Sequence, residues 1–185
     1  FYASSEWASG YPAATGIGTQ HGGILVDFNA VKGGIEIIPL DNDWQRAAHV
    51  YSDEVLISHR TDAEKGTPKF ERGKSLSDHQ REMIYISGTA AIRGEESIVT
   101  GDVLVQTEIT LENIQHLIGL EEGREKLPEH SGKLELLRVY LKHEEDAKIV
   151  KEDMDKLCPD VPIVYLYADV CREELLVEIE GIAYL

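Results

Sequence analysis

The stretch MIYISGTAA, from Met83 to Ala91, is a short apolar run of β-branched and aromatic residues that is interrupted by one glycine. This composition is typical of a buried strand. Gly88 predicts a tight backbone turn at the end of that strand. We therefore expect a central strand here, with the segments on either side of it as its partners.

The segments that follow alternate between helical and strand patterns. Apolar residues at helical spacing predict an amphipathic helix from Asp102 to Leu120 that ends near Gly119. A second, strongly charged helix is expected from Glu144 to Leu157, because Pro159 follows it. Apolar runs predict strands in KLELLRVYLKH, VPIVYLYADV and LLVEIEGIAYL. This order predicts an α+β fold in which two helices pack on one face of a mixed sheet.

The chain is predicted to consist of an N-terminal extension, residues 1–66, and a main domain, residues 67–185, which together form one globular unit. Residues 1–23 are rich in Ser, Gly, Ala and Thr and predict an ordered loop. The pair Gly16 and Gly18 is expected to make a turn, because no strand precedes it and no helix follows it, as a dinucleotide site would need.

Two further elements are expected between the N-terminal loop and the central strand. Apolar runs on both sides of Lys32-Gly33-Gly34 predict a β-hairpin from Ile24 to Leu40. Residues 41–80 are expected to be irregular, with one strand that VYSDEVLISH could form from Val50 onward.

Composition restricts the class of partner. A formal net charge of −16 makes a nucleic-acid partner improbable, since phosphate binding needs a clustered basic face. A small anionic substrate would need a local arginine pocket. No run of eighteen apolar residues occurs, so no membrane partner is expected. Only two cysteines are present, Cys158 and Cys171, and neither they nor the histidines have metal-ligand spacing. We expect a cytoplasmic protein without metal or cofactor.

Four motifs occur in one order between Thr67 and Leu185: ISGTAAI, VQTEITLENIQHLI, LLRVYLKH and LLVEIEGIA. In this order they resemble the RidA/YjgF superfamily. The resemblance implies a fold similar to that of chorismate mutase, usually assembled as a trimer with clefts between the subunits. In the imine and enamine deaminase branch, an arginine precedes the penultimate strand; here residues 161–164 are Val-Pro-Ile-Val.

A second branch matches more of the chain. The segments YPAATGIG from Tyr11, TPKFERG from Thr67, SGTAAI from Ser87 and YADVCREELLVEIEG from Tyr167 resemble the chorismatases. These enzymes hydrolyse the enolpyruvyl ether of chorismate to pyruvate and a dihydroxycyclohexadiene or hydroxybenzoate acid. Because they carry a further N-terminal domain of similar fold, the chain resembles their C-terminal half.

This resemblance assigns roles to individual residues. Glu178 corresponds to the catalytic carboxylate, Cys171 to a cysteine that lines the pocket in some members, Ala90 to the small residue opposite it, and Arg72 to an arginine that binds substrate. A carboxylic acid in apolar surroundings keeps its proton near neutrality, which suits proton donation to an enol ether. The pattern also allows an exposed Glu178 on a solvated face together with Glu180.

Further candidates could hold the substrate. Arg138 and Tyr140 lie on the less apolar face of their strand and could bind a carboxylate, although a salt bridge explains Arg138 equally well. Gly88, Thr89 and Ala90 could offer backbone donors at the end of the central strand, or form a plain turn.

Three functions fit these observations. The leading hypothesis is a chorismatase-like hydrolysis of an enolpyruvyl ether in a homotrimer. The second is a deaminase of reactive imines, and the third is a non-catalytic module that binds small molecules.

Overall fold

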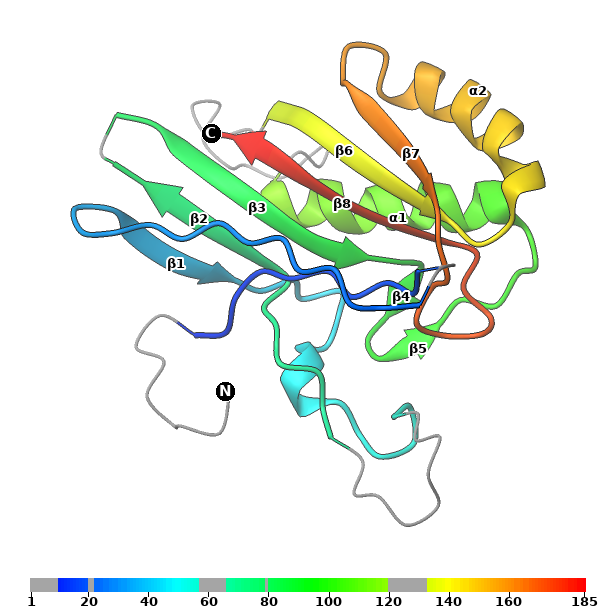
Figure 1. Ribbon diagram of the computed structural model, residues 1–185, viewed down its shortest axis with the longest axis horizontal. Coiled ribbons are helices and arrows are strands. Elements are labelled where there is room, and N and C mark those ends of the chain that lie inside the picture. The colour runs from blue at the N-terminus through cyan, green and yellow to red at the C-terminus, as the bar shows by residue number, and fades with distance from the viewer. Residues whose placement is uncertain (1–9, 20–21, 57–65, 79, 120–132) are drawn as a thin grey trace.

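Six strands form one sheet in the computed structural model, and both α-helices cover the same face of it (Figure 1). The structure describes residues 10–19, 22–56, 66–78, 80–119 and 133–185. The elements are β1 (Glu36–Leu40), a 3-10 turn (Ala48–Val50), β2 (Gly73–Ser77), β3 (Glu82–Thr89), β4 (Ile92–Arg93), β5 (Glu96–Ser97), α1 (Val103–Ile118), β6 (Lys133–Leu141), a 3-10 turn (Glu144–Asp146), α2 (Ala147–Leu157), β7 (Ile163–Tyr167) and β8 (Val177–Tyr184).

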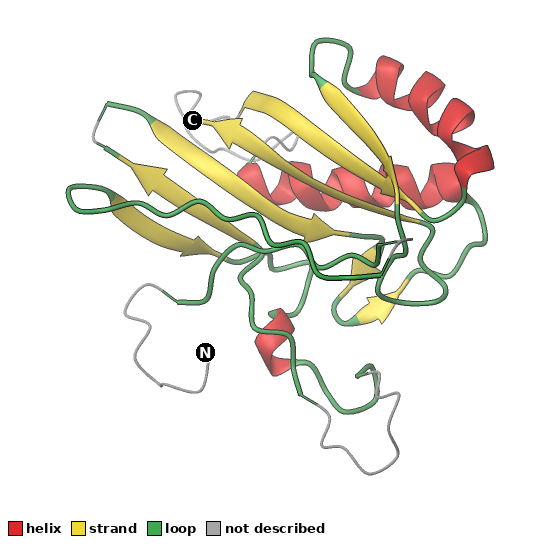
Figure 2. Cartoon of the chain, in the orientation of Figure 1, coloured by secondary structure: helices red, strands yellow, loops and turns green. Residues whose placement is uncertain are grey.

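The strand order is β1-β2-β3-β8-β6-β7, with the small β4-β5 hairpin apart from the sheet. β6 and β7 are parallel and are connected through α2, whereas the other neighbours in the sheet are antiparallel. Figure 2 shows the resulting two layers, strands on one side and helices on the other. The predicted α+β fold with a mixed sheet and two helices on one face is confirmed.

Alternation along the strands places the core between the sheet and the helices. In β8, Val177 and Ile179 are fully buried, and they pack in one cluster with Leu137 and Val139 of β6. Ile114 of α1 completes this layer with no exposed surface. The residues between them in β6 and β8 therefore point to the opposite, open face of the sheet.

Helix α1 begins and ends as its sequence predicts. Asp102 caps it, because its carboxylate accepts from the backbone N–H groups of Leu104 at 2.9 Å and Val105 at 3.4 Å. Gly119 ends the helix in the left-handed conformation, with φ 77°. None of the helices in the described parts of the chain has both the length and the apolar character needed to cross a membrane.

The predicted hairpin from Ile24 to Leu40 is wrong in its first half. The turn forms, since Gly33 and Gly34 both have positive φ, but β1 pairs along its length with β2 instead. Residues 24–31 form no strand, and Ile24 is 93% exposed. Their side chains bury little apolar surface, so burial does not offset the entropy lost in fixing a strand.

The region between β1 and β3 also differs from the prediction. The strand proposed from Val50 does not form, because a 3-10 turn and further turns occupy residues 48–55, and residues 57–59 lie outside the described ranges. A strand that we did not expect, β2, occurs at residues 73–77. Gly88 lies within β3, next to a register shift between Ile86 and Thr89, rather than in a turn after it.

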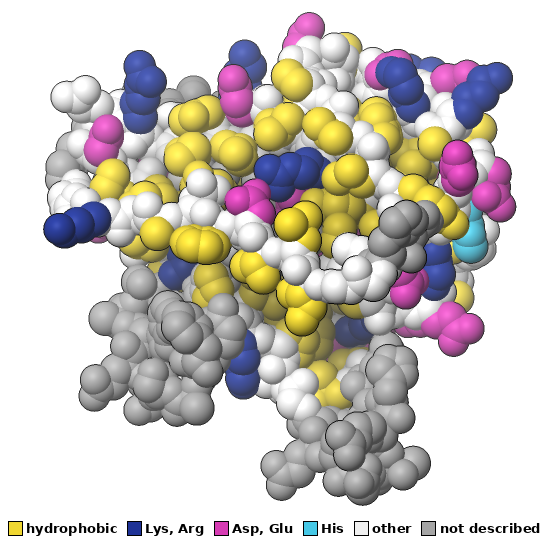
Figure 3. All heavy atoms as spheres, viewed as in Figure 1, with side chains coloured by type: hydrophobic (Ala, Val, Ile, Leu, Met, Phe, Trp, Pro, Cys, Tyr) yellow, Lys and Arg dark blue, Asp and Glu magenta, His cyan; other side chains and the backbone are white. Residues whose placement is uncertain are grey.

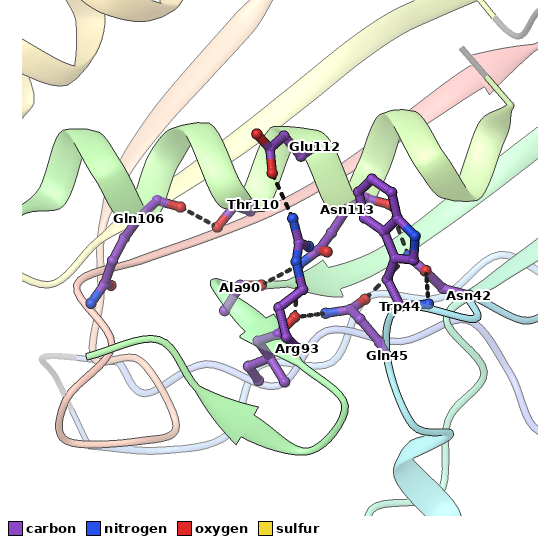
Figure 4. Close-up of polar contacts among 10 residues, drawn as sticks. Asn42, Trp44, Gln45, Ala90, Arg93, Gln106, Thr110, Glu112 and Asn113 are labelled. Atoms are coloured by element: carbon purple, nitrogen blue, oxygen red, sulfur yellow. Dashed lines mark hydrogen bonds and ion pairs between the residues drawn. The ribbon is translucent and has the colours of Figure 1, made fainter. Parts of the chain in front are cut away.

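Two polar residues of α1, Gln106 and Asn113, lie inside the protein, where they hold loops in place (Figure 4). The Nδ2 of Asn113 donates to the carbonyls of Ala90 and Ile92, each at 3.0 Å. The Nε2 of Gln106 donates to the Glu174 carbonyl at 3.0 Å, and its Oε1 accepts from the Leu176 N–H at 2.8 Å. These two side chains thus fix the backbone just after β3 and just before β8.

Replacing Gln106 by Met removes its hydrogen bonds to the Ile98 and Glu174 carbonyls and from the Leu176 N–H while keeping the length of the fully buried side chain. These partly buried backbone groups lose their partners, so we expect a loss of about 2–4 kcal/mol in the free energy of unfolding. Urea titration followed by circular dichroism measures it. Glu108→Met, at an exposed position of the same helix, is the matched control and should change the unfolding free energy little. Equal effects of the two changes would show that the hydrogen bonds of Gln106 do not stabilise the fold.

Candidate active site

Glu178 lies on the open face of the sheet at the start of β8, directly opposite Tyr140 of β6. It is only 5% exposed. Among the described residues, no hydrogen-bond donor or cation pairs with its carboxyl group. A buried carboxyl without a partner is uncommon in folded proteins, and such groups concentrate at functional sites.

The carboxyl group of Glu178 rests on the bare backbone of Gly88. A Cβ added at Gly88 would lie 2.1 Å from Oε1 of Glu178 and 2.8 Å from Cγ2 of Thr15. No side chain fits there without moving one of these groups. Any other residue at position 88 would therefore displace the Glu178 carboxyl or the Thr15 methyl group, so glycine is favoured here by space and not by its backbone angles.

Glu180, two residues further along β8, points to the same face but has partners. The Arg138 guanidinium forms an ion pair with its Oε1, and the Tyr140 hydroxyl donates to the same oxygen at 2.7 Å. The contact with Glu180 raises the pKa of Arg138, whereas the pKa of Tyr140 is raised first by burial and then by Glu180. Of the two carboxyl groups, one is thus held as a paired anion and the other is left alone.

The difference in partners between Glu178 and Glu180 affects the pKa of Glu178. Burial, and secondarily the negative charge of Glu180, raise the pKa of Glu178 to about 7. Near neutral pH its carboxyl group is therefore partly protonated and can donate a proton.

An N-terminal arm, residues 11–18, covers this end of the sheet and appears in Figure 1 as the dark blue trace. It is tied at one end to Glu71, whose carboxylate accepts from the Tyr11 N–H at 2.8 Å. At the other end Gly18 and Asp169, which follows β7, exchange two backbone hydrogen bonds. Since β8 and β6 lie between these two anchors in the sheet, the arm passes over the strand end that carries Glu178.

The remaining candidates are placed as follows. Thr89 and Ala90 are buried, and the Gly88 N–H is already bound by the arm, through the Thr15 Oγ1 at 2.9 Å. Ala90 packs with Val170, the neighbour of Cys171. The residue Cys171 is exposed, yet its thiol pKa is raised to about 11 by desolvation of the sulfur and by the nearby charge of Glu178. A thiol of this kind is protonated at neutral pH.

Arg72 is buried beside β3, where its backbone carbonyl accepts from the Ser87 N–H at 3.1 Å. Its guanidinium donates to the Arg46 carbonyl and to the Tyr51 hydroxyl, and it lies over the Tyr51 ring at 5.5 Å. Its Nε is buried without a hydrogen-bond partner in the described chain. No hydrogen bond or ion pair between described residues joins Arg72 to Glu178 or Arg138.

Glu178 does not line either of two cavities found among the described residues. Two cavities, of about 360 and 290 Å³, lie beside His116 and beside Arg172. Within the described ranges, no three His, Cys, Asp or Glu side chains are grouped closely enough to hold a metal ion. Figure 3 shows the open face instead as an apolar surface with charged side chains at its centre.

Comparison with known proteins agrees with this geometry. A chorismatase from Streptomyces rapamycinicus is 35% identical over 179 residues, which are 92% of this chain and 50% of the relative. The chain is a homologue of chorismatases. A solved chorismatase structure superimposes with a TM-score of 0.69 at 28% identity, over 93% of this chain and 50% of that one. This homologue therefore spans about half the length of the curated relatives that it matches.

The wider fold is also shared. An Entamoeba histolytica protein described as an endoribonuclease of the L-PSP type superimposes with a TM-score of 0.53 at 12% identity, over 81% of this chain and all of that one. At this identity the match shows a shared fold alone. No family model matches the sequence.

Sequence reasoning missed three residues that shape the site of this chorismatase homologue. Glu180 was considered only as a solvated neighbour of Glu178, because the pairing of β8 with β6 that places it beside Arg138 is not visible in one sequence. Thr15 lies in a segment interpreted as a plain loop. Gln106 carried a signal that could have been used, since it falls between apolar positions of an amphipathic helix.

Glu178→Gln should make stability less dependent on pH. A raised pKa means that the folded state holds a proton that the unfolded state releases, so native stability is lost as pH rises from about 4.5 through about 7. The neutral amide avoids this loss. We expect the variant to gain about 2 kcal/mol relative to the parent between about pH 5.5 and pH 8.5, measured by urea unfolding at both values.

Glu173→Gln is the control, since Glu173 is exposed in the loop before β8. Its difference from the parent should stay nearly constant over the same range. A Glu178→Gln variant that behaves like this control would show that Glu178 is ionised throughout.

Proposed function

We propose that this chain catalyses chorismatase-like hydrolysis of an enolpyruvyl ether, with Glu178 as the proton donor. The observation that carries the proposal is the buried carboxyl of Glu178, which has no partner in the described chain and a pKa raised to about 7. The homology to chorismatases over 92% of the chain supports it.

The reaction begins with transfer of the Glu178 proton to the methylene carbon of the enolpyruvyl group. This forms an oxocarbenium ion beside the new carboxylate, which stabilises it over a short distance in apolar surroundings. Water then adds to the cation and loses a proton, and the resulting hemiketal breaks its bond to the ring oxygen. The products are pyruvate and an alcohol on the ring, and Glu178 regains its proton.

Arg138 and Arg72 are the proposed binding groups for the carboxylates of the substrate. The side chain of Arg138 is 42% exposed despite its ion pair with Glu180, so part of its guanidinium faces solvent beside Glu178. A guanidinium has five donor hydrogens and can bind two carboxylates at once. Arg72 has no carboxylate partner among the described residues. In a chain of net charge −16 these arginines provide local positive charge.

Gly88, Thr89 and Ala90 are proposed to form the floor of the site, with Tyr140 and Cys171 beside it. The deaminase alternative is supported less well. Residues 161–164, where that branch places its carboxylate-binding arginine, contain none, and Val164 is 46% exposed at that position. Since both cysteines are free thiols, we propose a reducing, cytoplasmic location.

A homotrimer is the proposed assembly. The open face of the sheet exposes apolar side chains on the edge strand β7, where Val164 and Leu166 lie opposite Arg138 and Tyr140. An apolar face of this extent indicates a contact with another protein surface. Because Val164 and Leu166 share the open face with Glu178, a second copy packed on this face would form a cleft beside the carboxyl group.

Pyruvate release from chorismate tests the function directly, in an assay coupled to lactate dehydrogenase. We expect turnover in the parent and a loss of at least 100-fold in Glu178→Gln, since general acid catalysis contributes about 10²–10⁴-fold. The rate should also fall as pH rises through about 7, because the protonated carboxyl is the active form.

Glu173→Gln serves as the control and should keep the parental rate and pH profile. Release that persists unchanged in Glu178→Gln would remove this residue from its role. A folded protein that releases no pyruvate would contradict the function, and an imine-hydrolysis assay would then separate the deaminase from a binding module.

The assembly is tested by sedimentation equilibrium. We expect the mass of three chains for the parent and a shift to one chain in Leu166→Glu, because a charge would have to be desolvated in the interface. Lys148→Glu, at an exposed position of α2 on the helical face, is the control and should leave the mass unchanged. A monomeric parent would contradict the trimer.

A further inference from the structure

The arm crosses the site at one residue, Thr15. Its hydroxyl oxygen accepts from the Gly88 N–H at 2.9 Å, and the Gly88 N–H also contacts the Ala14 carbonyl at 3.3 Å. The side chain of Ser87 continues this contact, because its hydroxyl accepts from the Ala14 N–H at 3.0 Å. The arm is therefore fixed to β3 at the point where Glu178 rests on the same strand.

The methyl branch of the Thr15 side chain and the carboxyl of Glu178 border the same space above Gly88. Its methyl carbon and Oε1 of Glu178 both lie within 3 Å of the point that a Cβ on Gly88 would occupy. The hydrogen bond from Gly88 fixes the orientation of the hydroxyl, and a β-branched side chain has little freedom about χ1. The direction of the methyl group is thereby fixed toward Glu178.

We propose that Thr15 is a positioning residue of the site, whose methyl group confines the Glu178 carboxyl above Gly88 and keeps water out of that space. This inference rests on the proposed role of Glu178 as the acid. It states that part of the surroundings of the Glu178 carboxyl comes from a residue 163 positions earlier in the sequence. Because solvation favours the charged form of a carboxyl, a methyl group that excludes water keeps the proton on Glu178.

Two substitutions separate the two branches of the side chain. Thr15→Ser keeps the hydroxyl and removes the methyl group. Thr15→Val keeps the bulk and removes the hydroxyl, while the Ala14 carbonyl remains as an acceptor for Gly88. If the methyl group acts as proposed, the serine variant changes the titration of Glu178 and the valine variant does not.

Infrared difference spectroscopy of the protonated carboxyl band, with Glu178→Gln as the reference, reports this titration without any need for turnover. We expect the midpoint of Glu178 to fall by about one pH unit in Thr15→Ser, and to stay within a few tenths of a unit of the parent in Thr15→Val. The pH profile of pyruvate release should shift by the same amount, with kcat at high pH reduced about tenfold and KM changed less.

Urea unfolding of both variants checks that the arm and sheet remain folded. An unchanged midpoint in a folded Thr15→Ser, or a lowered one in Thr15→Val alone, would overturn the proposal and leave Thr15 as a tether of the arm. If the parent releases no pyruvate, the proposed function fails, but the infrared titration still decides whether Thr15 positions Glu178.

Discussion

The carboxyl group of Glu178 occupies space that a side chain on residue 88 would otherwise fill, and the arrangement around it follows from this exclusion. Gly88 lets β3 and β8 carry the carboxyl against bare backbone, where it is 5% exposed. A third segment, the N-terminal arm, closes this space and binds the N–H of the same glycine. A buried carboxyl at this point therefore depends on residues from both ends of the chain.

The two glutamates of β8 show how one strand can hold two protonation states. Both side chains point to the open face, and both neighbours in β6 are polar. Among the described residues, the side chains of Arg138 and Tyr140 contact Glu180 and each other but not Glu178, and the negative charge of Glu180 disfavours a second charge on Glu178. The pairing register of β6 with β8 sets this difference, because it places Arg138 opposite one glutamate and Tyr140 opposite the other.

Much of the fold could be predicted because it depends on local periodicity. The central strand, α1 with its Asp102 cap and the strand that carries Glu178 all follow from spacing within ten to twenty residues. The hairpin prediction from Ile24 was wrong in its first half. The turn sequence was interpreted correctly, but whether the strand before it forms depends on burial against other surfaces, which a turn sequence does not indicate. The partners of Gln106 and Thr15 could not be assigned from the sequence, since they lie about 70 residues away along the chain.

The arm has a consequence for the order of folding. Its anchors, Ser87-Gly88 and Asp169, reach one edge only when β3, β8, β6 and β7 are already paired. Closing loops of this length costs entropy before any contact forms, so the arm docks after the sheet. During synthesis the arm emerges before the strands on which it docks, yet it finds its place after they have paired, and until then the carboxyl of Glu178 lacks the cover of Thr15.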